Sequence, residues 1–216
     1  MRGRADMEDL LVWVDENDHE IGSGEKMDTH IRGQLHRAFS VFLFRESDGK
    51  LLIHRRAEGK YHSGGLWTNS CCSHPRRGED LFDAVIRRMR EELGFALCDD
   101  EADGRVDCRM REESDFTLHE GGTDDSLTAA TGAYGGLSEL GRFQYYQKYE
   151  DCAEHEIDHV FYLTVPDAQI TLSPDPEEIS EIQWISIDDL LVWMTRRPED
   201  FTAWFAPALE IVREYM

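Results

Sequence analysis

A thiol and an imidazole lie close together just before a predicted helix. Cys71 and Cys72 end a strand-like run, His74 follows them, and Pro75 and Gly78 then break the chain. If the chain is extended at the two cysteines, their side chains point to opposite faces, so only one is expected to do chemistry. Cys72 is the candidate, because His74 two residues away can tune a thiol or bind a metal. The alternative is a buried cysteine that behaves as a small apolar side chain.

Imidazole and carboxylate groups are scattered along the chain in a combination that suits a divalent ion. His30 and His36 precede a predicted buried strand, and Glu154 and Glu156 share one face of a later strand by the period of two. Together with His74 they would suit Mg²⁺, Mn²⁺ or Zn²⁺. Spacing alone is weak evidence, because histidines this far apart are usually unrelated. The other histidines are expected to be ordinary residues: His19, His54, His62, His119, His155 and His159.

A basic group formed by Arg55, Arg56 and Lys60 stands out in an acidic chain. The 216 residues include 45 acidic and 23 basic side chains, a formal net charge of −22. Such a surface repels nucleic acid and anionic membranes, so neither is expected as a partner. It also repels an anionic substrate, so a phosphate site must be locally basic or metal-assisted. The basic group therefore favours an anion site, with a solvated strand end as the alternative.

A helix is predicted over residues 79–93, where apolar side chains recur at helical spacing and Gly94 ends the pattern. Glu91 and Glu92 lie near its end, where the helix dipole disfavours carboxylates. Their position hints at a bound cation, and simple solvation is the alternative.

The elements that must position these groups are mixed strands and a few helices. Strands are expected over 10–15, 38–44, 51–54, 143–149, 154–165 and 182–185, and helices over 79–93, 187–196 and 202–215. Residues 21–36 are expected to form a short strand and then a loop. Because strands and helices do not alternate strictly, the order predicts an α+β sandwich.

The length favours one domain spanning residues 1–216. Without an 18-residue apolar run or a signal-peptide core, we expect a soluble, cytoplasmic protein. Five cysteines without a CxxC pair argue against a disulfide framework and a cysteine-only zinc site. Residues 99–141 have an acidic, glycine-containing composition without periodicity, which predicts an inserted surface segment. That segment could be a lid, a partner-binding segment or filler.

Several motifs together resemble type I isopentenyl-diphosphate Δ-isomerase, a divergent member of the Nudix superfamily. They are RR-x3-K followed by GLWTNS-x-C-x-HP, LH-x-AFS, an arginine-rich helix ending ELG, and a distant E-x-E strand. The resemblance runs from about Leu10 to Phe205, interrupted by 99–141. It implies a Nudix-like α/β/α sandwich with a mixed sheet. The implied enzyme is a monomer that interconverts isopentenyl and dimethylallyl diphosphate in isoprenoid precursor biosynthesis, by adding one proton and removing another.

The resemblance also implies roles for individual residues. The catalytic set would be the thiol Cys72, the carboxylate Glu156, the assisting Tyr145 and the aromatic Trp204. Lys26, Arg56 and Lys60 would contact the diphosphate, and Glu92 would hold a Mg²⁺ that bridges the diphosphate to the protein. A second divalent ion, Mn²⁺ or Zn²⁺, would be held by three histidines and two glutamates: His30, His36, His74, Glu154 and Glu156.

The predicted helix also partly matches the hydrolytic Nudix pattern G-x5-E-x7-REU-x-EE-x-GU, so a Nudix pyrophosphohydrolase acting on a diphosphate is the alternative function. Ser73 replaces the glycine of this pattern, and Arg88 replaces its first helical glutamate. The missing glutamate belongs to the carboxylate cluster that holds metal in the hydrolases, so the isomerase is favoured. A non-enzymatic protein whose acidic segment binds a partner conflicts with the intact set of candidate groups.

Overall fold

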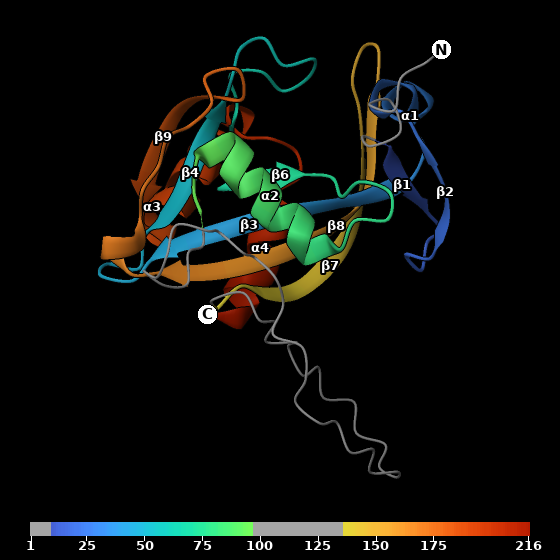
Figure 1. Ribbon diagram of the computed structural model, residues 1–216. Helices are drawn as coiled ribbons and strands as arrows, with labels where there is room; N and C mark the ends of the chain where they lie inside the picture. The colour runs from blue at the N-terminus through green and yellow to red at the C-terminus, as the bar shows by residue number, and fades with distance from the viewer. Residues whose placement is uncertain (1–9, 97–135) are drawn as a thin grey trace, which may run out of the picture.

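The computed structural model describes residues 10–96 and 136–216, and strand β3 (His36–Arg45) organises this part of the chain (Figure 1). One edge of β3 pairs in parallel with β8 (Ala153–Val165) from His36↔Glu156 to Arg45↔Val165. The opposite edge is shared by three antiparallel strands. These are β1 (Leu11–Val14) at His36, β6 (Cys71–Ser73) at residues 39–41, and β4 (Leu51–Arg56) at Phe44.

The remaining strands extend this nine-stranded sheet. They are β2 (Glu20–Gly24) beside β1, β5 (Trp67–Thr68) and β9 (Ile179–Ile185) beside β4, and β7 (Ser138–Lys148) beside β8. All of these pairs are antiparallel, so the parallel β3–β8 pair makes the sheet a mixed one, as the sequence predicted.

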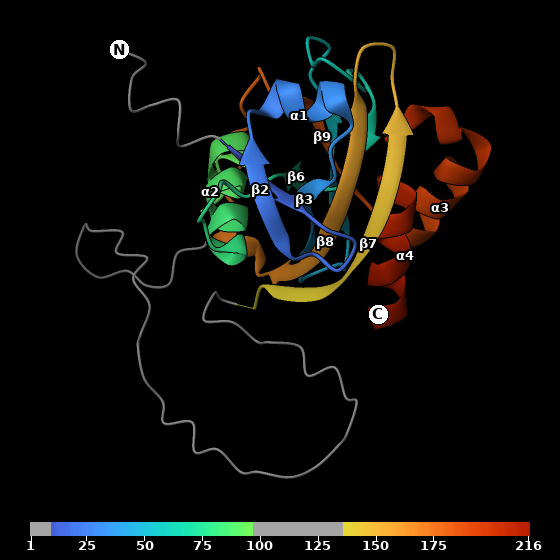
Figure 2. The ribbon, with the colours of Figure 1, turned by 90° about the vertical axis from the view of Figure 1, so that its right-hand side faces the viewer.

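Helices cover both faces of the sheet. Figure 2 shows α2 (Leu81–Leu93) on one side and α3 (Ile187–Arg196) and α4 (Phe205–Tyr215) on the other. Alternate residues of β3 serve the two faces: Val41 packs in the cluster with α2, and Phe42 packs in the cluster with α4. The architecture is therefore an α/β/α sandwich, which confirms the predicted fold class.

Helix α2 begins two residues later than predicted. The side chain of Asp80 caps its first turn by accepting hydrogen bonds from the backbone N–H groups of Phe82 and Asp83. At the other end, Gly94 takes a left-handed conformation with φ of 63°, which stops the helix just after Glu92 and Leu93.

A short helix, α1 (Lys26–Arg32), occupies part of the segment where a loop was predicted. Glu25 caps its start through the N–H of Asp28, and Gly33 ends it with φ of 61°. Its seven residues are too few to show an apolar period, which is why the prediction was wrong. The error matters for the site, because α1 carries Lys26 and His30.

The predicted surface insertion, 99–141, falls mostly outside the described residues. Its end was placed too late, because β7 begins at Ser138 rather than at Phe143. A register shift between Glu139 and Gly141 interrupts the alternation of side chains there, which hid the start of the strand. Across residues 10–96 and 136–216, no helix combines the length and apolar character that a bilayer crossing needs.

Candidate active site

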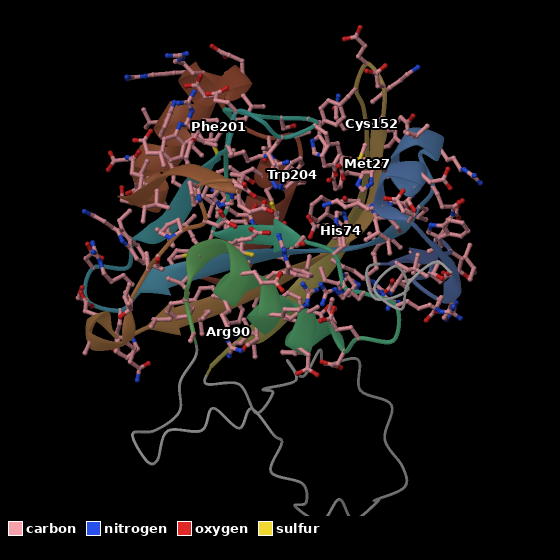
Figure 3. The ribbon with its side chains drawn as sticks, turned by 45° about the horizontal axis from the view of Figure 1, so that its top comes forward. Met27, His74, Arg90, Cys152, Phe201 and Trp204 are labelled. Carbon is pink, nitrogen blue, oxygen red and sulfur yellow. The ribbon has the colours of Figure 1, made fainter. Side chains whose placement is uncertain are left out.

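A pocket of about 570 Å³, including its open mouth, brings together residues from distant parts of the chain. The predicted catalytic and substrate-binding residues all line it: Lys26, Arg56, Lys60, Cys72, Tyr145, Glu156 and Trp204. Of the predicted metal ligands, His74, Glu92 and Glu154 line it as well. Figure 3 shows His74 and Trp204 in the same central region of the molecule, beside β6.

Five of the predicted metal ligands form a compact cluster. One donor atom from each of His30, His36, His74, Glu154 and Glu156 lies within 4.8 Å of every other. Donors about 2.1 Å from one octahedral ion would lie about 3 Å apart when adjacent and about 4.2 Å apart when opposite. The cluster therefore has the dimensions of a divalent metal site.

Two of the imidazoles are held in the orientation that metal binding requires. Nδ1 of His30 lies 2.6 Å from the carbonyl of Lys26, and Nδ1 of His36 lies 2.8 Å from the carbonyl of Gln34. Each Nδ1 therefore carries the proton, and the Nε2 lone pair turns toward the glutamates. Nε2 of His36 is buried without a hydrogen-bond partner. A metal ion would satisfy this nitrogen, so the residues present fit a divalent ion.

The carboxylate of Glu156 is held by hydrogen bonds from several sides. Oε2 accepts a 2.6 Å hydrogen bond from the Tyr145 phenol, and Oε1 lies 2.8 Å from Nε2 of His74. Burial raises the pKa of Glu156, but the neighbouring Glu154 and His36 side chains and the hydrogen bond from Tyr145 outweigh burial and hold the pKa below its ordinary value. Burial and the neighbouring Glu156 raise the pKa of Tyr145. The pair is therefore a carboxylate and a neutral phenol.

The two cysteines face opposite sides of β6, as predicted. Cys71 is buried in the apolar cluster with α2, whereas Cys72 lines the pocket. Burial raises the pKa of the Cys72 thiol to about 12, so the thiol keeps its proton at neutral pH. Cys72 pairs with Ser40 on one edge of β3, and Glu156 pairs with His36 on the other edge. The thiol and the carboxylate thus enter the pocket from opposite edges of one strand.

Trp204, just before α4, lines the pocket. Its ring lies 6.3 Å from the Tyr145 ring, and the guanidinium of Arg56 lies 5.4 Å from its centre. The segment leading to it is tied down by a 3.0 Å hydrogen bond from the Thr202 N–H to the carbonyl of Trp67. Trp204 is therefore fixed in the pocket wall by contacts on several sides.

A second charged group lies beside the metal cluster. Lys60 and Arg88 both contact the carboxylate of Glu178, and Arg88 also contacts Glu92. Burial, with Lys60 and Arg88 nearby, lowers the pKa of Lys26. These cations repel one another, and an anion bound among them would relieve that repulsion.

Polar atoms left without partners also point to this pocket. Among the described residues, the buried side-chain atoms lacking a hydrogen bond are His36 Nε2, Arg56 Nε, Arg88 Nε, Asp158 Oδ1 and Trp204 Nε1. Four of these residues line the pocket, and His36 belongs to the metal cluster. Buried polar groups in proteins are normally paired, so the concentration of unpaired polar atoms around this pocket indicates a site that binds ligands.

Comparison with known proteins agrees with this arrangement. Residues 34–205 match the NUDIX domain family. The chain is 40% identical over 204 residues to the isopentenyl-diphosphate Delta-isomerase of Burkholderia multivorans, covering 94% of this chain and 93% of that protein. It is 38% identical over 206 residues to isopentenyl-diphosphate Delta-isomerase 2 of Aromatoleum aromaticum, covering 95% and 87%. The chain belongs to the isopentenyl-diphosphate Delta-isomerase family.

Solved structures share the fold of this isomerase-family chain. A Deinococcus radiodurans protein superposes with a TM-score of 0.60 at 20% identity, covering 96% of this chain and 100% of that one. The MutT protein of Methanosarcina mazei gives a TM-score of 0.53 at 18% identity, covering 84% and 95%. At these identities the similarity establishes the Nudix fold alone.

Sequence reasoning missed several pocket residues of this isomerase-family member. Arg88 was noticed only as a departure from the hydrolase pattern, although its spacing of four from Glu92 is that of a helical ion pair. Glu178 lies in no motif. His62 was expected to be an ordinary histidine, yet it is buried and contacts Glu154 in the pocket. For Glu178 and His62 no spacing in the sequence could have indicated the contact.

Proposed function

We propose that this protein interconverts isopentenyl diphosphate and dimethylallyl diphosphate, the reaction named by its relatives. The observation that carries the proposal is the placement of the Cys72 thiol and the Glu156 carboxylate in one pocket, from opposite edges of β3. One group holds a proton and the other lacks one. That is the starting state that a proton-addition and proton-removal reaction needs.

The reaction moves a double bond along a five-carbon chain. The terminal carbon of the double bond gains a proton, and the carbon two bonds away loses one. The central carbon between them keeps the double bond, which now joins it to the carbon that lost its proton. We assign the two proton transfers to Cys72 and Glu156, with Tyr145 donating a hydrogen bond that holds the carboxylate in place. A positioned acid or base typically contributes ~10²–10⁴-fold to such a rate. In the reverse direction the two groups exchange roles.

Protonation of the double bond leaves a tertiary carbocation. The face of Trp204 is positioned to stabilise that charge, a contact that contributes about 0.5–2 kcal/mol. The ring of Tyr145 lies beside Trp204 and closes the same side of the pocket. Excluding water matters here, because water would convert the cation to an alcohol.

The diphosphate would be bound at the basic end of the pocket by Lys26, Arg56 and Lys60. Arg88 shares this end and contacts Glu92, the proposed ligand of a Mg²⁺ that would neutralise the diphosphate. We assign Mn²⁺ or Zn²⁺ to the cluster of three histidines and two glutamates, since a mixed imidazole and carboxylate set suits both ions. A bound divalent ion supplies positive charge that favours the ionised form of Glu156.

We also propose that residues 1–216 form one Nudix-like domain. Segments on both sides of residues 97–135 contribute to one continuous sheet, because β3 and β8 pair directly.

The test is to incubate isopentenyl diphosphate with the protein, Mg²⁺ and Mn²⁺ in D₂O and to follow the products by NMR. Dimethylallyl diphosphate carrying deuterium, without free phosphate, is the expected result. Release of phosphate and an isoprenyl monophosphate would instead support a Nudix hydrolase. Hydrolysis is disfavoured, because Arg88 brings a positive charge to the position where that pattern has a metal-binding glutamate.

A further inference from the structure

His62 contacts the proposed metal cluster from outside it. The residue lies in the loop between β4 and β5, its side chain is buried, and its Nε2 contacts Oε1 of Glu154. Oε1 also lies 3.3 Å from Nε2 of His30, a proposed ligand. Because a carboxylate oxygen accepts hydrogen bonds, Nε2 of His62 carries the proton in this contact.

The other side of the His62 ring is fixed by the turn between β7 and β8. Nδ1 lies 3.2 Å from the Ser63 hydroxyl, which lies 3.0 Å from the Tyr149 hydroxyl. The His62 and Tyr149 rings stack with centres 4.8 Å apart and planes 24° apart. The ring is thereby held in one plane, with Nε2 directed at Glu154.

The loop that carries His62 also carries Lys60 and lies against Arg56, two groups proposed to bind the diphosphate. Lys60 lies two residues before His62, and Nη2 of Arg56 donates a 3.3 Å hydrogen bond to the His62 carbonyl. The His62 ring further meets the Trp204 ring edge-on at 5.9 Å. Backbone hydrogen bonds tie down the base of this loop, including one from the Gly65 N–H to the Arg56 carbonyl, and the side-chain contacts of His62 add to them nearer its tip.

We propose that His62 is a positioning residue that orients Glu154 for metal binding and, in turn, lets a bound metal order the loop carrying Lys60. The inference rests on the proposed metal centre. Hydrogen-bond partners behind metal ligands typically change metal affinity by about 10–100-fold. Coupling between two sites is reciprocal, so if the ordered loop favours metal binding, bound metal favours the ordered loop by the same free energy.

The first test measures the affinity of the metal-free full-length chain for Mn²⁺ by isothermal titration calorimetry, without substrate. We expect His62→Ala to weaken binding by about 10–100-fold and His62→Gln, which keeps an N–H donor, to recover part of the loss. His155→Ala is the matched control. His155 also neighbours Glu154, but its Nδ1 donates to the Gly33 carbonyl and its Nε2 accepts from the Gln144 amide, so this variant should bind Mn²⁺ like the unchanged protein.

The second test measures hydrogen–deuterium exchange of residues 57–66 with and without Mn²⁺. In the unchanged protein Mn²⁺ should slow exchange in this loop, and in His62→Ala the slowing should be lost. If His62 served only local packing, His62→Ala would raise exchange by the same amount with and without Mn²⁺. That result would overturn the proposal. Unaltered Mn²⁺ affinity in His62→Ala would overturn it as well.

If His62→Ala does not fold, Ser63→Ala replaces it in the exchange measurement, because this change removes only the Ser63 hydroxyl that contacts Nδ1 of His62. Lost Mn²⁺-dependent protection would support the proposal, and full protection would overturn it. Neither measurement uses isopentenyl diphosphate, so a failure to isomerise it would remove the proposed function and leave this inference standing. An unchanged protein that binds no Mn²⁺ would overturn the inference itself.

Discussion

Tyr145 donates a 2.6 Å hydrogen bond to Oε2 of Glu156, from the neighbouring antiparallel strand. A hydrogen bond to a charged group contributes about 1.5–3 kcal/mol. We therefore expect Tyr145→Phe to lower kcat by about 10–100-fold while the metal content stays the same. The measurement is steady-state isomerisation together with metal analysis. Tyr146→Phe is the control, because the Tyr146 side chain is exposed and should leave kcat unaltered. Equal effects of the two changes would contradict the assignment.

Replacing Cys72 with alanine tests the thiol as a proton-transfer group. We expect isomerisation to fall by ~10²–10⁴-fold or more, because one of the two acid/base groups is lost. Folding and metal content should remain, since Cys72 is not among the proposed ligands. Cys152→Ser controls for the loss of a thiol elsewhere in the chain. Activity retained in Cys72→Ala would remove Cys72 from the mechanism.

The buried His54 predicts a specific dependence of stability on pH. Burial, with Arg56 nearby, lowers the pKa of His54 from 6.5 to about 4. Between these values the unfolded chain binds the proton and the folded chain does not, so stability falls as the pH falls from 6.5 toward 4. By pH 5 this residue should cost about 2 kcal/mol.

The comparison that isolates this effect is urea unfolding of the unchanged protein and of His54→Gln at pH 7.5 and pH 5. The variant should lose less stability between the two pH values, by about 2 kcal/mol. Equal losses in the two proteins would mean that His54 is not buried in its neutral form.

Arg88 and Glu92 form a largely enclosed ion pair, with side chains 20% and 5% exposed. Removing one partner leaves a buried charge without compensation, which typically costs about 3–5 kcal/mol. We expect Arg88→Met to lower the free energy of unfolding by that order in metal-free buffer, and the Arg88→Met/Glu92→Met double variant to recover much of it.

The exposed pair Arg32 and Asp28 provides the contrast, with side chains 65% and 44% exposed. Arg32→Met should cost less than about 1 kcal/mol. A cost at Arg88 no larger than the cost at Arg32 would show that water reaches the Arg88–Glu92 pair.

The parts of the site that the sequence could predict are those set by local geometry. The period of two placed Glu154 and Glu156 on one face and Cys71 and Cys72 on opposite faces, and the structure confirms both. The short helix α1 was missed, because its seven residues, of which only Thr29 and His30 are buried, are too few to show an apolar period. The contact between His62 and Glu154 joins residues 92 positions apart through a loop without regular spacing, so only the folded chain shows it.

The parallel pairing of β3 with β8 joins His36 to Glu156 across most of the chain's length. Parallel neighbours cannot be connected by a tight turn, and contacts between such distant residues form late and slowly in folding. During synthesis Cys72 and all three proposed histidine ligands therefore leave the ribosome well before Glu154 and Glu156 are made. For part of its synthesis the nascent chain therefore has the thiol and the imidazoles of the proposed site but not its carboxylates. The proposed site is complete only after β7 has supplied Tyr145, β8 has supplied Glu154 and Glu156, and the segment before α4 has supplied Trp204.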